Sequence, residues 1–413
     1  MAVFFLFCAL PTAAIVAWGA VCRSPWHRQA EAQRLGHELG LEVAIHDLCY
    51  PRPGVTRYEG LTLSDPETGH ELFRCPSLEV SLATMADSHG LSRPAIVLTA
   101  PRAEIESSAC ERLDQTLQQR LQCPQSRPET EIRLSVEQLV LRSPQKNRTL
   151  LAVEGGIGAL PGGVQAQASF RLPESRAAEP IQIRMVRNRQ IVPPANGFEL
   201  TTAGNELPCQ LLALAVPEVA ALGPDCRLAG YAWTYHTPAG LQGELTGQLL
   251  QVDLGGLVSS HFPHPLRCTA DITVQRARFQ NGRLEELAGL LSAGPGEISR
   301  SLVESAVSHL GLAQPVTVSG TAEMLPFDCL AVEFSLTSEG LWLAGRCPTP
   351  QRGTVLSVAR QPLLGEPTVA QPQPVAALIQ LLAPASAIQV PATRQTDWLT
   401  RLLPATDVIS PSR

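Results

Sequence analysis

Charge and large aromatic side chains are both scarce in this sequence. Charged residues make up only 17% of the 413 residues, the formal net charge is −6, and Lys146 is the only lysine. A nucleic-acid-binding surface requires clustered basic residues, so nucleic acid is not expected as a partner. Five tryptophans and four tyrosines are too few to predict a surface on which sugars or bases stack.

The short motifs that carry catalysis are also missing. The chain contains no G-x-S-x-G elbow, no Walker loop and no dinucleotide-binding glycine fingerprint. Paired carboxylates occur at Glu285 and Glu286, and we interpret them as a solvated face beside Arg283. We therefore expect no enzyme and no cofactor. A hydrolase whose site is assembled from residues distant in sequence stays open as an alternative.

The eleven cysteines form no CxxC pair, and no Cys/His spacing matches a zinc site, so no metal site is expected. His261 and His264 form an isolated HxxH in a Pro-rich segment, which favours a turn surface over a metal site.

Cys329 and Cys347 flank a segment that predicts a hairpin turning at 338–339, and the hairpin would place them nearly opposite each other. A cross-strand disulfide in an oxidising compartment and two buried thiols are both open.

Short runs of alternating apolar and polar residues dominate what the sequence does contain. A period of two places the apolar set on one face of a strand. Such runs occur at Leu41, Val43 and Ile45, at Leu61 and Leu63, at Leu78, Val80 and Leu82, and at Ile132, Leu134 and Val136. Turn signals rich in proline and glycine separate them. The pattern predicts a mainly β (α+β) fold, with an elongated antiparallel sheet and a few capping helices.

Four segments favour helices instead. Residues 25–40 predict a short amphipathic helix, and a capping box at Ser108 precedes a leucine stripe that ends near residue 121. Residues 207–222 predict a helix interrupted at Pro217. Residues 297–310 present a broad apolar face.

The segment from Ala2 to Cys22 has no charged residue and is long enough to span a bilayer as a helix, so we expect an uncleaved membrane anchor. A cleaved signal peptide is the alternative, but the basic start that such a peptide needs is missing. Basic residues follow it directly, at Arg23, Arg28 and Arg34. By the positive-inside rule alone, they would leave the body of the protein in the cytoplasm.

The same N-terminal region resembles the first module of AsmA-like proteins, the class that includes TamB. In that family an anchor is followed by a strand, a "PG" turn, a "GL-x-L-x-D" strand and an "L-x-V-x-L" strand. Here they correspond in order to Pro53-Gly54, to 60–65 and to 78–82. More loosely, 243–254 is similar to the family's recurring "G-x-L-x-G-x-L-x-x-VDL" pattern. The resemblance covers about 2–105 and part of 243–312.

The resemblance implies a single-pass protein of the bacterial cytoplasmic (inner) membrane with its body in the periplasm, contrary to the flanking arginines. It also implies a sheet curled into a groove whose apolar lining accommodates lipid acyl chains. The implied lining residues are Val43, Ile45, Leu61, Leu63, Leu78, Val80, Leu82, Ile132, Leu134 and Val136. Membrane lipids and other envelope proteins are the implied partners, and lipid transport or outer membrane biogenesis is the implied role. A structural scaffold with a filled core is the alternative.

We predict four segments along the chain: an anchor at 1–24, an AsmA-like β module at 25–128, a β-rich body at 129–360 and a Pro/Ala/Gln-rich tail at 361–413. The tail holds two short apolar stretches, 375–383 and 397–403. Either they dock onto the body or they lie on a membrane surface.

Overall fold

The structure is a computed structural model of the full chain. It describes 24–86, 92–109, 131–143, 147–160, 162–214, 216–237, 240–259, 262–316, 322–369 and 371–382, together with 12, 13, 16, 19, 21 and 22. The chain divides into two compact units. Unit 1 comprises Met1–Arg176 and Gln182–Arg187, and unit 2 comprises Ala177–Ile181 and Asn188–Arg413.

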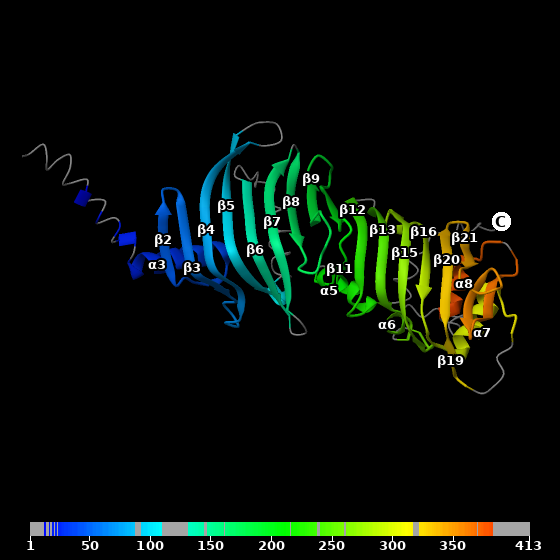
Figure 1. The fold of residues 1–413 in the computed structure, drawn as a ribbon. Helices are drawn as coiled ribbons and strands as arrows, with labels where there is room; N and C mark the ends of the chain where they lie inside the picture. Colours follow the sequence, from blue (N-terminus) through cyan, green and yellow to red (C-terminus); the bar gives the residue numbers. More distant parts are fainter. Residues whose placement is uncertain are drawn as a thin grey trace, which may run out of the picture. The chain divides into compact units, whose positions relative to one another are not determined.

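Unit 1 is built on one twisted sheet, whose strands are visibly curved (Figure 1). Strands β1 and β2 both pair with β3, and β3 to β8 then follow one another in sequence order across the sheet. The elements of unit 1 are α3 (Pro25–Leu39), β1 (Glu42–Ala44), β2 (Asp47–Arg52), β3 (Val55–Ser64), β4 (Glu71–Ala86), β5 (Ser92–Glu106), β6 (Glu131–Arg142), β7 (Arg148–Leu160), β8 (Gly163–Arg171) and most of β9 (Ile181–Asn188).

The mainly β prediction is confirmed, but the expectation of a purely antiparallel sheet is wrong. Strands β5 and β6 pair in parallel, with Ile96 opposite Ile132 and Leu98 opposite Leu134. A parallel pair needs a crossover connection of about a dozen residues or more. The stretch between Glu106 and Glu131 is long enough for one. The helix predicted from Ser108 to near residue 121 lies in this stretch: residues 107–109 are helical, and the rest lies outside the described residues.

Helix α3 confirms the helix predicted at 25–40. The side chain of Ser24 accepts a hydrogen bond from the backbone N–H of His27 at 3.2 Å, Pro25 occupies the first turn, and Gly40 ends the helix at φ 67°. These are standard start and stop signals. No residue of α3 is buried, so polar contacts attach it to the sheet.

Unit 2 contains a second run of hydrogen-bonded strands and a three-stranded sheet made of β14, β17 and β19. In the larger run β12, β13, β15, β16, β20 and β21 pair consecutively, all antiparallel. The elements of unit 2 are β10 (Ala195–Thr201), β11 (Leu207–Pro208), α5 (Cys209–Leu212), η2 (Pro217–Leu222), β12 (Arg227–Thr237), β13 (Gly240–Asp253), α6 (Leu254–Ser259), β14 (Leu266–Arg267), β15 (Thr269–Gln280), β16 (Arg283–Ala293), β17 (Gly296–Ser299), α7 (Arg300–Leu310), β18 (Leu312–Ala313), β19 (Met324–Phe327), β20 (Cys329–Thr337), β21 (Gly340–Gly345), β22 (Thr354–Val358), β23 (Gln361–Pro367) and α8 (Val375–Leu382).

The helices of unit 2 are shorter than the sequence pattern predicts. The segment 207–222 begins with β11, and its described residues then form the single-turn α5 and the 3-10 helix η2, which begins at Pro217. Helix α7 begins three residues later than expected because Ser299 caps it and the residues before it form β17. Its end is as predicted, with Gly311 at φ 62°.

Part of the predicted tail belongs to the folded body. Strand β23 pairs with β22 and β18, and α8 packs against α7. Val375 and Ala377 of α8 are buried, so the stretch 375–382 docks, while 397–403 lies outside the described residues. Most of the predicted anchor also lies outside them. Among the described residues, no helix is long and apolar enough to cross a membrane.

Candidate functional site

Apolar side chains form rows across strands β4 to β8 of unit 1. Residues paired across neighbouring strands point to the same face of a sheet, so the register defines each row. The middle row contains Val80, Leu98, Leu134, Gly155 and Ala168. The outer row contains Leu82, Ile96, Ile132, Ile157 and Ala166. On the inner side of the middle row, Ala100, Val136 and Val153 are paired. We call this surface the apolar face.

The inner side of the apolar face is buried, whereas the middle and outer rows are incompletely buried. Val136 is 3% exposed, Leu134 is 36% exposed and Leu82 is 73% exposed. The isoleucines of the outer row are half-buried. Contiguous exposed apolar surface on a soluble unit commonly marks a binding site for protein, membrane or ligand.

Small residues on β7 and β8 contribute to this exposure. Leu134 lies directly opposite Gly155, which has no side chain to cover it, and Gly155 is in turn opposite Ala168. A Cβ added to Gly155 would come into ordinary contact with Leu134, at 3.7 Å from its Cβ. The space beside Leu134 is therefore open rather than filled.

Directly behind the apolar face, the opposite side of the same strands carries a polar row, although further along the strands that side is apolar at Ala103, Leu139 and Leu150. One row, defined by the same registers, contains Arg57, Glu79, Thr99, Ser135, Glu154 and Ser169. Arg57 and Glu79 form an ion pair at 2.5 Å, and their hydrogen bond raises the pKa of the Arg57 guanidinium. In this part of the sheet, the apolar rows and the polar row therefore point to opposite sides.

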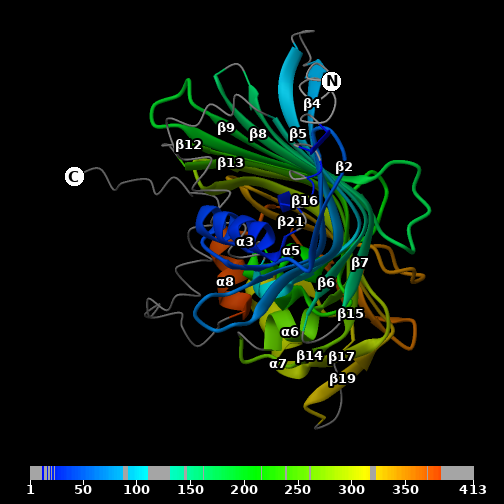
Figure 2. The ribbon, with the colours of Figure 1, turned by 90° about the vertical axis from the view of Figure 1, so that its left-hand side faces the viewer.

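Helix α3 packs against β1, at the end of the sheet that precedes β4 (Figure 2). Tyr58 is the register partner of Leu78 and so shares its face, and it is only 7% exposed. Its hydroxyl donates a hydrogen bond to Oε1 of Glu31 on α3 at 2.9 Å. Burial, together with the nearby Glu31 carboxylate, raises the pKa of the Tyr58 phenol well above its ordinary value.

Six of the ten predicted lining residues lie on this surface. Leu78, Val80, Leu82, Ile132, Leu134 and Val136 belong to or border the apolar face. The other four lie on or next to β1 and β3. Leu61 is 5% exposed and is paired with the fully buried Cys75, so it belongs to a packed core. Val43 pairs with Leu63, and Ile45 follows the end of β1.

The prediction missed Ile96, Leu98 and Ile157 as lining residues. Ile96 and Leu98 carry the same period-two signal within β5. Ile157 follows the pair Gly155-Gly156, which suggests a turn or bulge from sequence but lies inside β7.

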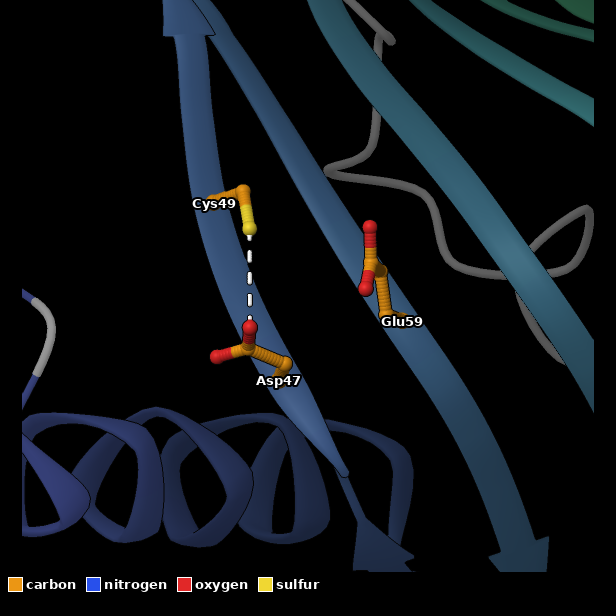
Figure 3. A group of neighbouring side chains, drawn as sticks. All are labelled: Asp47, Cys49 and Glu59. Atoms are coloured by element: carbon orange, nitrogen blue, oxygen red, sulfur yellow. Dashed lines mark hydrogen bonds between the residues drawn. The ribbon is translucent and has the colours of Figure 1, made fainter.

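A second candidate is the group formed by Asp47, Cys49 and Glu59 on β2 and β3 (Figure 3). One ligand atom from each lies within 4.8 Å of the others, and the Cys49 thiol donates a hydrogen bond to Oδ2 of Asp47 at 3.7 Å. Burial and the adjacent Asp47 carboxylate raise the pKa of Cys49, which disfavours the thiolate that a metal requires. Zinc also takes four ligands in structural sites. This group is a weaker candidate than the apolar face.

A hydrolytic site would need a nucleophile, a base and a group that orients the base. In unit 2, Nδ1 of His264 is 3.0 Å from the hydroxyl oxygen of Ser301. The other ring nitrogen, Nε2, is buried and has no carboxylate partner among the described residues. Burial lowers the pKa of His264. His261, the other half of the HxxH, lies outside the described residues.

Unit 2 also carries an open cleft of about 670 Å³ beside the turns of the β15–β16 and β20–β21 hairpins. Its lining is mainly polar and includes Arg278, Arg283, Glu285 and Thr337. Such a lining does not suit an acyl chain.

The predicted hairpin at 338–339 is confirmed, since Thr337 pairs with Gly340. Cys329 and Cys347 are free thiols in the structure, and the Cys347 thiol donates to the backbone oxygens of Cys329 and Val355 at 3.3 and 3.2 Å. The disulfide between them stays a prediction.

Comparison of the chain with protein-family models, curated proteins and solved structures finds no match.

Proposed function

We propose that unit 1 binds lipid acyl chains on its apolar face, as part of a membrane-anchored, AsmA-like envelope protein that conveys lipid or supports outer membrane biogenesis. The observation that carries the proposal is the outer row from Leu82 to Ala166, which is apolar on every strand and incompletely buried. On the opposite side of the strands, the row from Arg57 to Ser169 directly behind the apolar face is polar.

The dimensions and chemistry of the apolar face suit an acyl chain. Neighbouring strands lie about 4.8 Å apart, so a row across β4 to β8 is roughly 20 Å long, the scale of one extended fatty acyl chain. Removing a methylene from water contributes about 0.8 kcal/mol, and this gain requires no specific polar partner. A polar headgroup would remain in water beyond Leu82, where exposure is greatest.

The experiment measures lipid bound to the full chain purified in detergent. Mass spectrometry should find copurified phospholipid or fatty acid in the wild type. The fluorescent fatty acid cis-parinaric acid should bind to the delipidated protein. The Leu134→Asp variant places a carboxylate in the middle row and should lose the copurified lipid and weaken cis-parinaric acid binding at least tenfold, which corresponds to about 1.4 kcal/mol.

The matched control is Ser135→Asp, which places the same charge one residue further on, on the polar face. It should bind lipid as the wild type does. Absence of lipid from the wild type, or equal binding by both variants, would eliminate the apolar face as the lipid site and favour the scaffold. Misfolding of Leu134→Asp with a normal Ser135→Asp would show an enclosed core and favour the scaffold as well.

The proposed topology has a separate test. A C-terminal alkaline phosphatase fusion should be active and the matching fluorescent-protein fusion should be dark if the body is periplasmic. The reverse result would place the body in the cytoplasm, as the arginines after residue 22 suggest.

A further inference from the structure

Cys209 and Cys226 of unit 2 occupy directly opposite backbone positions. Strands β11 and β12 are antiparallel, with Leu207 opposite Leu228 and Pro208 opposite Arg227. One further step along this register places Cys209 opposite Cys226. The backbone N–H of Cys209 donates a hydrogen bond to the backbone oxygen of Cys226 at 2.8 Å, so the opposed arrangement continues beyond the last paired residues.

This arrangement satisfies the backbone requirement of a disulfide. Directly opposite residues of an antiparallel pair have Cα atoms about 4.5–5.5 Å apart, within the usual range of about 4.4–6.8 Å for disulfides. The two side chains also point at each other, since each thiol sulfur is the hydrogen-bond partner of the other. The exposed fractions are 0% for Cys209 and 1% for Cys226, so neither thiol faces solvent.

The other cysteine pair of unit 2 differs in its backbone register. Cys329 is paired with Ser357 across β20 and β22, so the register does not place it opposite Cys347. The Cys347 thiol donates hydrogen bonds to the backbone oxygens of Cys329 and Val355, and burial together with the nearby Cys329 side chain raises the pKa of Cys347.

We propose that Cys209 and Cys226 form an intramolecular disulfide in the cell. The two thiols lose two protons and two electrons as the S–S bond forms. The electrons pass to the disulfide of a thiol–disulfide oxidoreductase, which is reduced to a dithiol. Exchange proceeds through a mixed disulfide between the enzyme and one of the two cysteines.

Oxidation has to precede the burial of this pair. In the folded unit both sulfurs are inaccessible, and the hydrogen bond to Cys226, together with burial, raises the pKa of the Cys209 thiol. A protonated, buried thiol does not attack a disulfide. Once formed, the bond would be equally protected from reductants, so it would survive cell lysis and report the compartment in which the chain folded.

The disulfide would close the segment that contains α5 and η2. The two cysteines are 17 positions apart, and cross-linking a loop of this size restricts the unfolded chain. We expect the melting temperature of unit 2 to fall by about 6–12 °C when the bond is reduced.

The test traps thiols in cells that express the full chain. Cells are quenched with acid and denatured, free thiols are blocked with N-ethylmaleimide, and the protein is digested without reduction. Trypsin alone leaves both cysteines in one peptide, 190–227, but a glutamate-specific protease also cuts after Glu218, between them. Peptides 207–218 and 219–227 should then be recovered as one linked species that separates on reduction.

The melting temperature provides a second readout. The protein is unfolded in denaturant and refolded with or without dithiothreitol, and the melting curves of the two preparations are compared. Refolding under reducing conditions should lower the melting temperature of the wild type but not of Cys209→Ala. The control Cys75→Ala removes a buried thiol of unit 1 and should keep the wild-type response to reductant.

Maleimide on both Cys209 and Cys226 in quenched cells would overturn the disulfide, whatever the lipid assay shows. The linked peptides in a protein that binds no lipid would leave the disulfide standing and overturn the lipid function.

Discussion

A graded leucine-to-alanine series tests whether the apolar face is open in the protein. Leu82, Leu134 and Leu150 all belong to strands of unit 1, and they differ chiefly in exposure: 73%, 36% and 6%. The same three carbon groups are deleted at each position. The free energy of unfolding should therefore fall in proportion to burial.

The magnitudes follow from the buried fraction. Three fully buried carbon groups contribute about 2.4 kcal/mol at about 0.8 kcal/mol each. Leu82, about a quarter buried, should lose only about 0.6 kcal/mol, and Leu134, about two-thirds buried, should lose about 1.5 kcal/mol. At Leu150 the full transfer free energy plus a residual cavity should cost about 2.5–5 kcal/mol.

Hydrogen–deuterium exchange of delipidated protein, read by mass spectrometry on peptides from β4 to β7, measures the stability of unit 1 without interference from unit 2. The three variants should rank Leu82, Leu134, Leu150 in increasing cost. If Leu82→Ala cost as much as Leu150→Ala, another part of the chain or a second copy would have to enclose the outer row. The open apolar face, and the lipid function built on it, would then be refuted.

Two further predictions concern electrostatics and backbone packing. The hydrogen bond from Arg142 lowers the pKa of Glu104 below its ordinary 4.5. Because the unfolded chain then takes up the proton first as pH falls, the stability advantage of the wild type over Glu104→Gln should be complete at neutral pH and should be lost progressively below about pH 4.5. Urea unfolding at a series of pH values measures this difference, and a difference that does not depend on pH would contradict the prediction. In unit 2, a Cβ at Gly230 would collide with the backbone oxygen of Thr246, so Gly230→Ala should lower the urea unfolding free energy by about 1–3 kcal/mol. The control Gly294→Ala has nothing within 4 Å of the new Cβ and should change it by less than about 0.5 kcal/mol; equal effects would refute the close approach.

Local patterns allowed the strands to be predicted, but not their neighbours. Alternation at Leu78, Val80 and Leu82 is a property of one strand, and the structure contains that strand as β4. The parallel pairing of β5 with β6 depends on a long connection and on contacts between residues far apart in sequence. Alternation within one strand does not specify such contacts. The same limit applies to Cys209 and Cys226, whose opposition depends on the register of β11 against β12.

The candidate site was predictable to a similar degree. Val136 and Leu134 belong to one alternating set on one strand, yet one is 3% exposed and the other 36%. The difference comes from their partners: Val136 lies opposite Val153, which covers it, and Leu134 lies opposite Gly155, which does not. The register between strands decides which residue lies opposite each of them. The sequence therefore predicted that both residues are on the apolar side, but not that Val136 is buried and Leu134 exposed.

Comparison with unit 2 indicates what the exposure in unit 1 means. Unit 2 has its own apolar row, defined by register across six strand pairs, and four of its members are buried: Leu200, Ala277, Leu336 and Leu341. Both units thus bury an apolar row, which in unit 1 is the inner row at Ala100, Val136 and Val153, but the outer row of unit 1 is incompletely buried. A single exposed leucine such as Leu82 would be ordinary on any surface. A whole row beside it that is apolar and only half-buried is what a scaffold leaves unexplained, and an acyl chain laid along that row would complete its burial.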